Sequence, residues 1–293
     1  MRIEAASVAG SDDKESEDWL SATAELIVVL DGQTARTDTG CSHGVAWYTA
    51  HLGAALVTAA TDPGTPLADA LAAAIEATGR LHPDCDLTSP ATPGAAVAVV
   101  RLGPHIDYLV LGDVTIALDT GKRVQVIVDD RVEHTAVPER RYVDRFPIGS
   151  PEKAEGLIRM KHAELAARNT TGGFWVAAAD PNAARHAITG SIDAAQVKRF
   201  AVLTDGAARI VKPFRALRWP GLLTLLDSAG PTALIQRVRA LEAADPLGKK
   251  WPRNKQSDDA SVVYVALTER HTARRFIRTK SGKRQARWRR RRR

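Results

Sequence analysis

Cysteine and aromatic residues are scarce in this sequence of 293 residues. Its two cysteines, Cys41 and Cys85, form no CxxC pair, which argues against a disulfide framework and favours a reduced setting. Aromatic residues make up 5% of the chain, so alanine, valine and leucine must fill most of the core. No apolar run approaches the roughly 20 residues that span a bilayer, and the polar, acidic N-terminus lacks the apolar centre of a signal peptide. We therefore expect a cytoplasmic protein without a transmembrane segment.

Positive charge is concentrated at the C-terminal end of the chain. Residues 270–293 contain 13 lysines and arginines and no acidic residue, so residues 1–269 carry a formal net charge of −6 although the whole chain carries +7. We expect two regions: a globular domain over 1–269 and a disordered basic tail over 270–293. The tail is either a site for a polyanion, such as RNA, DNA or an acidic protein, or a solvated extension.

Apolar runs and helical spacings alternate along residues 24–267. Strands are predicted over 24–30, 95–101, 108–111, 114–118, 124–128, 174–176, 197–203 and 260–267. Helices are predicted over 44–60, 66–77, 152–168 and 219–243, the last broken at Gly230-Pro231, with a loop over 80–93. The short links between residues 95 and 128 indicate antiparallel hairpins. Grouped strands and grouped helices favour an α+β layered sandwich over a doubly wound parallel sheet.

Aspartates occur where several of these strands end or begin. Asp31 follows LIVVL, Asp205 follows FAVLT, Asp258-Asp259 precede ASVVYV, and Asp113 lies between YLVL and VTIAL. A single Asp-Gly after a strand is usually only a turn. Carboxylates from four such strand ends, gathered at one rim, would instead provide the oxygen ligands that Mg²⁺ and Mn²⁺ prefer.

The order of these motifs resembles that of a known family. Glu17-Asp18, VVLDG, LGD, VLTDG and DDASVVYV, spread over about residues 8–267, are similar to the PPM family of metal-dependent protein phosphatases 2C. The stretch DTGCSHGVAWYTAHLGAAL looks like an actinobacterial-type subgroup of that family. The resemblance implies a four-layer α-β-β-α sandwich. It also implies hydrolysis of phosphoserine and phosphothreonine on proteins.

The resemblance also implies a role for each acidic position. Asp31 matches the aspartate that bridges two Mn²⁺ or Mg²⁺ ions, and Gly32 the residue whose carbonyl oxygen binds one of them. The remaining matches are Asp205 and Asp258 as metal ligands, Glu17 and Asp18 as the N-terminal acidic pair, and Asp113 beside a weaker third metal position. Asp259 stands where the family often has asparagine. Two ions about 3.5–4 Å apart would orient a water for in-line attack on phosphorus.

The sequence departs from the family pattern around the substrate phosphate. Asp13 stands where the family usually has a phosphate-binding arginine, and the common DGxGG is absent after Asp31. Lys14 and Arg36 are the candidate replacements, although a lysine offers a point charge rather than a bidentate fork. His43 is either a proton donor to the leaving group or a residue that orients the following helix. Cys41 is interpreted as a small buried residue rather than a nucleophile.

These departures leave two alternatives to an active enzyme. The first is a catalytically weak or inactive phosphatase-like module that serves in regulation or binding. The second is a nucleic-acid-associated protein that acts through its arginine-rich tail.

Overall fold

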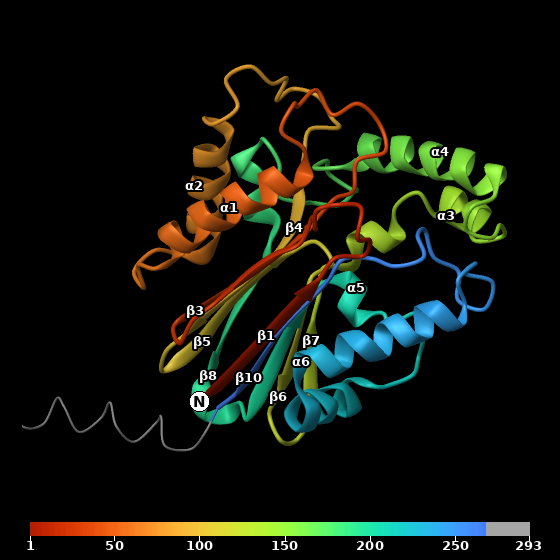
Figure 1. Ribbon diagram of the computed structural model, residues 1–293. Helices are drawn as coiled ribbons and strands as arrows, with labels where there is room; N and C mark the ends of the chain where they lie inside the picture. Colours follow the sequence, from red (N-terminus) through yellow and green to blue (C-terminus); the bar gives the residue numbers. More distant parts are fainter. Residues whose placement is uncertain (268–293) are drawn as a thin grey trace, which may run out of the picture.

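Two five-stranded antiparallel sheets form the centre of the computed structural model, which describes residues 1–267 (Figure 1). Sheet A has the order β1-β10-β9-β6-β7. Its strands are β1 (Arg2–Val8), β10 (Ala260–Ala266), β9 (Arg199–Leu203), β6 (Thr115–Asp119) and β7 (Val124–Ile127). Sheet B has the order β2-β3-β4-β5-β8. Its strands are β2 (Trp19–Ala22), β3 (Leu26–Gly32), β4 (Ala95–Leu102), β5 (His105–Leu111) and β8 (Ile188–Asp193).

Helices cover the outer face of each sheet (Figure 1). The helices are α1 (Val45–Ala60) and α2 (Leu67–Gly79) on sheet B, α5 (Asp205–Ala208) and α6 (Trp219–Ala244) on sheet A, and α3 (Val137–Val143) and α4 (Pro151–Ala167), which pack on each other. Three 3₁₀ turns complete the described chain: η1 (Asp130–His134), η2 (Pro181–His186) and η3 (Ala194–Gln196). The order of layers is helix, sheet, sheet, helix, which confirms the predicted α+β sandwich.

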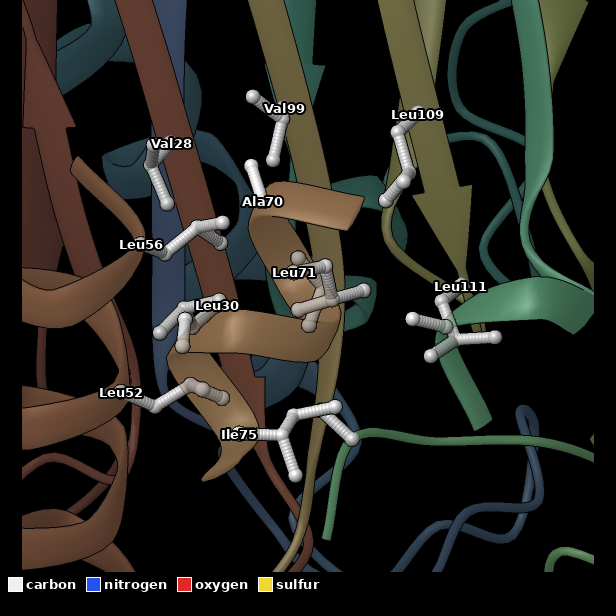
Figure 2. Packing of buried hydrophobic residues seen from close by; sticks show 14 of the residues in the cluster. Val28, Leu30, Leu52, Leu56, Ala70, Leu71, Ile75, Val99, Leu109 and Leu111 are labelled. Atoms are coloured by element: carbon white, nitrogen blue, oxygen red, sulfur yellow. The ribbon is translucent and has the colours of Figure 1, made fainter. Parts of the chain in front are cut away.

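Strand β3 shows why the strand sequences are continuously apolar instead of alternating. Ile27 and Val29 point to the core between the two sheets, while Val28 and Leu30 point to α1 and α2. Successive side chains of a strand face opposite sides, so a strand buried on both faces needs apolar residues at every position. Figure 2 shows the outer core, in which Leu52 of α1 and neighbouring helix residues pack on this face of sheet B.

The long helix α6 changes direction where the sequence predicts. Gly230 has a left-handed φ of 79° and Pro231 follows it, so the helix is interrupted between two segments. Leu222, Leu226 and Val238 from the two segments pack on sheet A. The prediction of a helix over 219–243 broken at Gly230-Pro231 is confirmed.

One predicted hairpin is wrong. The runs 108–111 and 114–118 belong to different sheets, because β5 pairs with β4 and β8, whereas β6 pairs with β7 and β9. The link at Gly112 therefore crosses from sheet B to sheet A. Gly112 has φ +81°, and a Cβ there would lie 2.7 Å from the Cβ of Ala96, so this crossing requires glycine.

Three edge strands and one short helix are missing from the sequence prediction. Strands β1, β2 and β8 and helix α3 were not predicted from the sequence, because their residues are mostly half-buried or exposed and lack a clear apolar period. Residues 174–176 form no strand but lie between two isolated bridges, Arg168 with Phe174 and Ala95 with Ala177. No helix within residues 1–267 is long and apolar enough to cross a membrane. The predicted basic tail, 270–293, lies outside the described residues.

Candidate metal centre

Acidic residues from five separate segments meet near one end of the two sheets. Asp31 is the penultimate residue of β3, and Asp205 is the first residue of α5, directly after β9. Asp113 lies in the crossing between β5 and β6, and Asp258 lies just before β10. Asp18 completes this acidic cluster from the segment before β2. The cluster is defined here as these five carboxylates, and the strands behind them fix their positions.

Asp31 and Asp205 are joined directly. The backbone N–H of Asp205 donates to Oδ2 of Asp31 over 3.1 Å. Burial raises the pKa of Asp31 well above its usual range, and the negative charges of Asp205, Asp18, Asp113 and Asp258 raise it further. Burial and the Asp258 charge likewise raise the pKa of Asp205, although the residue keeps exposed surface. Without a cation, these carboxylates therefore disfavour the fully ionised state.

Asp18 and Asp113 show the same effect. Asp18 is 8% exposed and accepts a hydrogen bond from the Thr204 hydroxyl over 2.9 Å. Burial raises the pKa of Asp18 to about 8 against the opposing effect of its hydroxyl partners, and Asp259 and Asp205 add repulsion. Burial and Asp205 raise the pKa of Asp113 to about 7. A bound cation would reverse this balance by favouring the ionised carboxylates.

The neighbouring acidic residues organise the N-terminal segment. The Asp259 carboxylate accepts the backbone N–H of Gly10 over 2.7 Å and that of Glu17 over 2.8 Å. Glu17 in turn accepts the Thr34 hydroxyl at Oε2 over 2.6 Å. Gly32 packs tightly beneath this segment, since a Cβ there would lie 2.5 Å from the carbonyl oxygen of Glu17. Asp259 thus holds the acidic pair in place.

Two cations that the sequence analysis missed neutralise Asp258. The Nη2 of Arg209 donates to Oδ2 of Asp258 over 2.6 Å, and Nζ of Lys255 forms an ion pair with Oδ1. Lys255 also donates to the Thr34 hydroxyl over 3.1 Å. Burial opposes its charge, but Asp258 raises the pKa of Lys255, with Asp205 and Asp31 contributing. Neither cation lies in a recognisable motif, so only the folded structure identifies them.

The donor set suits hard divalent cations, with one restriction. Clustered carboxylates that repel one another are the oxygen ligands that Mg²⁺ and Mn²⁺ take. Carboxylates that come from five segments can be shared between two ions about 3.5–4 Å apart. The carboxylates available as metal ligands are those of Asp31, Asp205, Asp113 and Asp18. Asp258 could bind a metal ion only after separating from Lys255.

The remaining candidates lie at different distances from the cluster. Lys14 is exposed, and Arg36 is half-buried and electrostatically coupled to Lys161 of α4. His43 lies instead between Cys41 and Cys85, with its ring stacked on Trp47 at 4.2 Å. Cys41 is half-buried, so the expectation of a buried cysteine is wrong.

A cavity of about 890 Å³ lies elsewhere on the molecule. Leu26, Arg101 and His105 line it, at the end of β3 opposite to Asp31. A rise of five residue steps, about 16 Å, separates Leu26 from Asp31 along the strand. The cavity and the acidic cluster are therefore distinct places in the fold.

No protein-family model and no curated protein matches the chain. Solved structures, in contrast, match it over most of its length. The catalytic domain of the serine/threonine protein phosphatase PstP, in complex with two manganese ions, superposes with a TM-score of 0.54 at 19% identity, covering 90% of this chain and 96% of that one. The chain has the fold of the PPM phosphatases. The PPM phosphatase MsPP from Mycobacterium smegmatis, in complex with cacodylate, gives 0.52 at 18% identity over 92% of this chain and 99% of that one.

The PPM-type fold extends to a third example from another organism. The serine/threonine phosphatase Stp1 from Staphylococcus aureus gives a TM-score of 0.54 at 10% identity, covering 91% of this chain and 94% of that one. The match spans nearly the full length in each case. It confirms the PPM-type architecture predicted from the order of the acidic motifs, while the actinobacterial subgroup stays a prediction.

Proposed function

We propose that this chain is a metal-dependent phosphatase that hydrolyses phosphoserine and phosphothreonine on proteins. The observation that carries the proposal is the convergence of Asp31, Asp205, Asp113 and Asp18 from distant segments, with pKa values raised by burial and mutual repulsion. A protein gains nothing in stability from such repulsion, so a ligand of opposite charge is its natural use. The PPM-type fold, shared with a phosphatase holding two manganese ions, supports the same function.

Mn²⁺ or Mg²⁺ would be held by Asp31, with the Gly32 carbonyl, and by Asp205 and Asp258, with Asp113 near a weaker third position. When bound, these ions would polarise the phosphate and activate a water. The chain's own contribution is positional. Thr34 orients Glu17, Thr204 orients Asp18, and Asp259 fixes the backbone between them. Glu17 and Asp18 are proposed to orient the attacking water.

Phosphate binding is assigned to basic residues on the Glu17 side of the cluster. Burial lowers the pKa of Lys161, which also senses the charges of Arg36 and Glu17, so both of these side chains lie within electrostatic range of Lys161. Arg36 and Lys161 would supply the positive charge of the arginine that this chain lacks, and exposed Lys14 lies three residues before Glu17 in the chain. His43 stays a candidate proton donor only if substrate reaches the loop that carries it.

Turnover of a generic aryl phosphate tests the proposal. We expect hydrolysis that requires Mn²⁺, and a loss of at least about 100-fold in kcat/KM for Asp31→Asn and Asp205→Asn, because each removes a charged ligand. Asp107→Asn is the matched control, since Asp107 lines the cavity at the opposite end of sheet B. Manganese binding should be measured by calorimetry on the same proteins. Activity that is independent of metal, or equal in all variants, contradicts the proposal.

A phosphatase-like binding module is the second candidate. The ion pairs of Asp258 with Arg209 and Lys255 favour it, because they neutralise a proposed ligand with cations of the chain itself. In that case the wild-type protein would retain a phosphopeptide without releasing phosphate, with or without Mn²⁺. Phosphate release measured beside peptide binding separates the two candidates.

Residues 1–269 are proposed to form the phosphatase unit, and the basic segment 270–293 a separate site for a polyanion. The polyanion site is supported by the many arginines and the absence of acidic residues in segment 270–293.

A further inference from the structure

Four side chains of the types that can bind a metal lie in two neighbouring loops outside the acidic cluster. Cys41 and His43 lie between β3 and α1, and His82 and Cys85 lie between α2 and β4. The sulfur of Cys85 lies 3.6 Å from that of Cys41 and 3.4 Å from Nδ1 of His43. The sulfur of Cys41 lies 3.7 Å from the same nitrogen. Three ligand atoms thus form a nearly equilateral triangle.

The edges of this triangle match the coordination shell of zinc. Zn–S bonds of about 2.3 Å and Zn–N bonds of about 2.0–2.1 Å in a tetrahedron place two sulfurs about 3.8 Å apart and sulfur and nitrogen about 3.6 Å apart. The observed separations of 3.4–3.7 Å agree with these values. A disulfide would bring the two sulfurs to about 2.05 Å, and both cysteines are free thiols.

His82 supplies an independent observation. Its side chain is 3% exposed, and its Nδ1 bonds to the Thr78 carbonyl oxygen over 2.9 Å, which places the ring proton on Nδ1. Nε2 of His82 then carries no proton and can only accept a hydrogen bond. Among the buried side-chain nitrogen and oxygen atoms of residues 1–267, it is the one without a hydrogen-bond partner. An unpaired buried acceptor is costly. Ligating histidines commonly donate their other N–H to a backbone carbonyl in this way.

His82 lies with the other candidate ligands. Ligand atoms of Cys41, His43 and His82 all lie within 4.8 Å of one another, as do those of Cys41, His43 and Cys85. The backbone already fixes the two loops together, since the N–H of Asp86 donates to the Gly40 carbonyl over 2.8 Å. Trp47 packs on both histidines, with its ring centre 4.2 Å from His43 and 4.6 Å from His82.

We propose that Cys41, His43, His82 and Cys85 form a tetrahedral Zn²⁺ site. Four protein ligands leave no open position for substrate, so the zinc is structural and not catalytic. The soft thiolates select Zn²⁺ over the Mg²⁺ and Mn²⁺ that carboxylates prefer. The ion fastens the segment between Gly32 and α1 to the end of α2, and that segment begins directly after Asp31. The site stands whether or not the acidic cluster hydrolyses phosphate.

Metal content of the full chain tests this site. Protein purified in the presence of Zn²⁺ and then exhaustively dialysed should retain about one zinc per chain by mass spectrometry of the metals. The double variant Cys41→Ser/Cys85→Ser should retain less than about one tenth of that amount, because it removes both thiolates. His105→Ala is the control, since His105 is an exposed histidine on β5. Circular dichroism would show that each variant is folded.

Cobalt gives a readout that reports the ligands themselves. Co²⁺ added to metal-free protein should produce sulfur-to-cobalt charge transfer and the intense visible bands of a tetrahedral ion, both absent from the double variant. His43→Ala changes an exposed side chain and should weaken the bands without unfolding the protein. Three results would overturn the site: no retained zinc in the wild type, equal zinc in the double variant, or a Cys41–Cys85 disulfide in place of bound metal.

Discussion

Replacing Asp18 by asparagine should remove a pH-dependent loss of stability. Burial gives the Asp18 carboxyl a pKa of about 8 in the folded protein against 3.8 in the unfolded chain. The folded state therefore holds the proton over the interval in which the unfolded state releases it, and stability falls as the pH rises from about 4 to about 8. For a single group with these two values, the loss between pH 5 and pH 8 is about 4 kcal/mol.

The asparagine of the Asp18→Asn variant would keep the hydrogen bond from Thr204 to the side-chain oxygen while carrying no charge. Free energies of unfolding from urea titrations at pH 5 and pH 8, without added Mn²⁺ or Mg²⁺, measure the effect for both proteins. The wild-type value should fall by about 4 kcal/mol more than that of Asp18→Asn. Saturating Mn²⁺ at pH 8 should recover part of the wild-type loss. Parallel pH dependences of the two proteins, or a wild type that gains stability relative to the variant, would refute the reasoning.

Two further predictions concern charged residues elsewhere. Lys255→Met should tighten Mn²⁺ binding about tenfold in calorimetry, because it removes a cation that occupies Oδ1 of Asp258; unchanged affinity would exclude Asp258 from the metal ligands. Deletion of residues 270–293 should abolish retention of RNA or DNA on a column at low salt, and the intact protein should lose retention steeply as salt rises. Equal retention of both forms would show that the basic segment binds no polyanion.

Strand cores and their terminal aspartates were predictable because burial on both faces leaves an unmistakable apolar run. LIVVLDG and the run from Phe200 to Leu203 identified β3, β9 and the carboxylates that follow them. Strand pairing was not predictable in the same way. The three-residue link around Asp113 fits a hairpin and a sheet crossing equally well, and only the packing around Gly112 distinguishes them.

Long-range partners of the cluster were beyond the sequence. Arg209 reaches Asp258 from the end of α5 and also bonds to the buried Glu242 over 2.7 Å, a pairing set by how α6 crosses sheet A. The sequence analysis missed the two cysteines as candidate zinc ligands for a different reason. A search for CxxC passes over Cys41-x-His43 and His82-x-x-Cys85, in which each loop contributes one thiol and one imidazole.

Strand β10 lies between β1 and β9, so the last strand of the described chain joins the edge strand β1 to the rest of sheet A. During synthesis, β1 leaves the ribosome first and must wait for almost the whole domain before β10, its neighbour within residues 1–267, emerges. Asp258 and Asp259, immediately before β10, arrive at that same moment. A nascent or C-terminally shortened chain therefore lacks both a continuous sheet and a complete acidic cluster, which makes any activity of the cluster an all-or-none property of the finished domain.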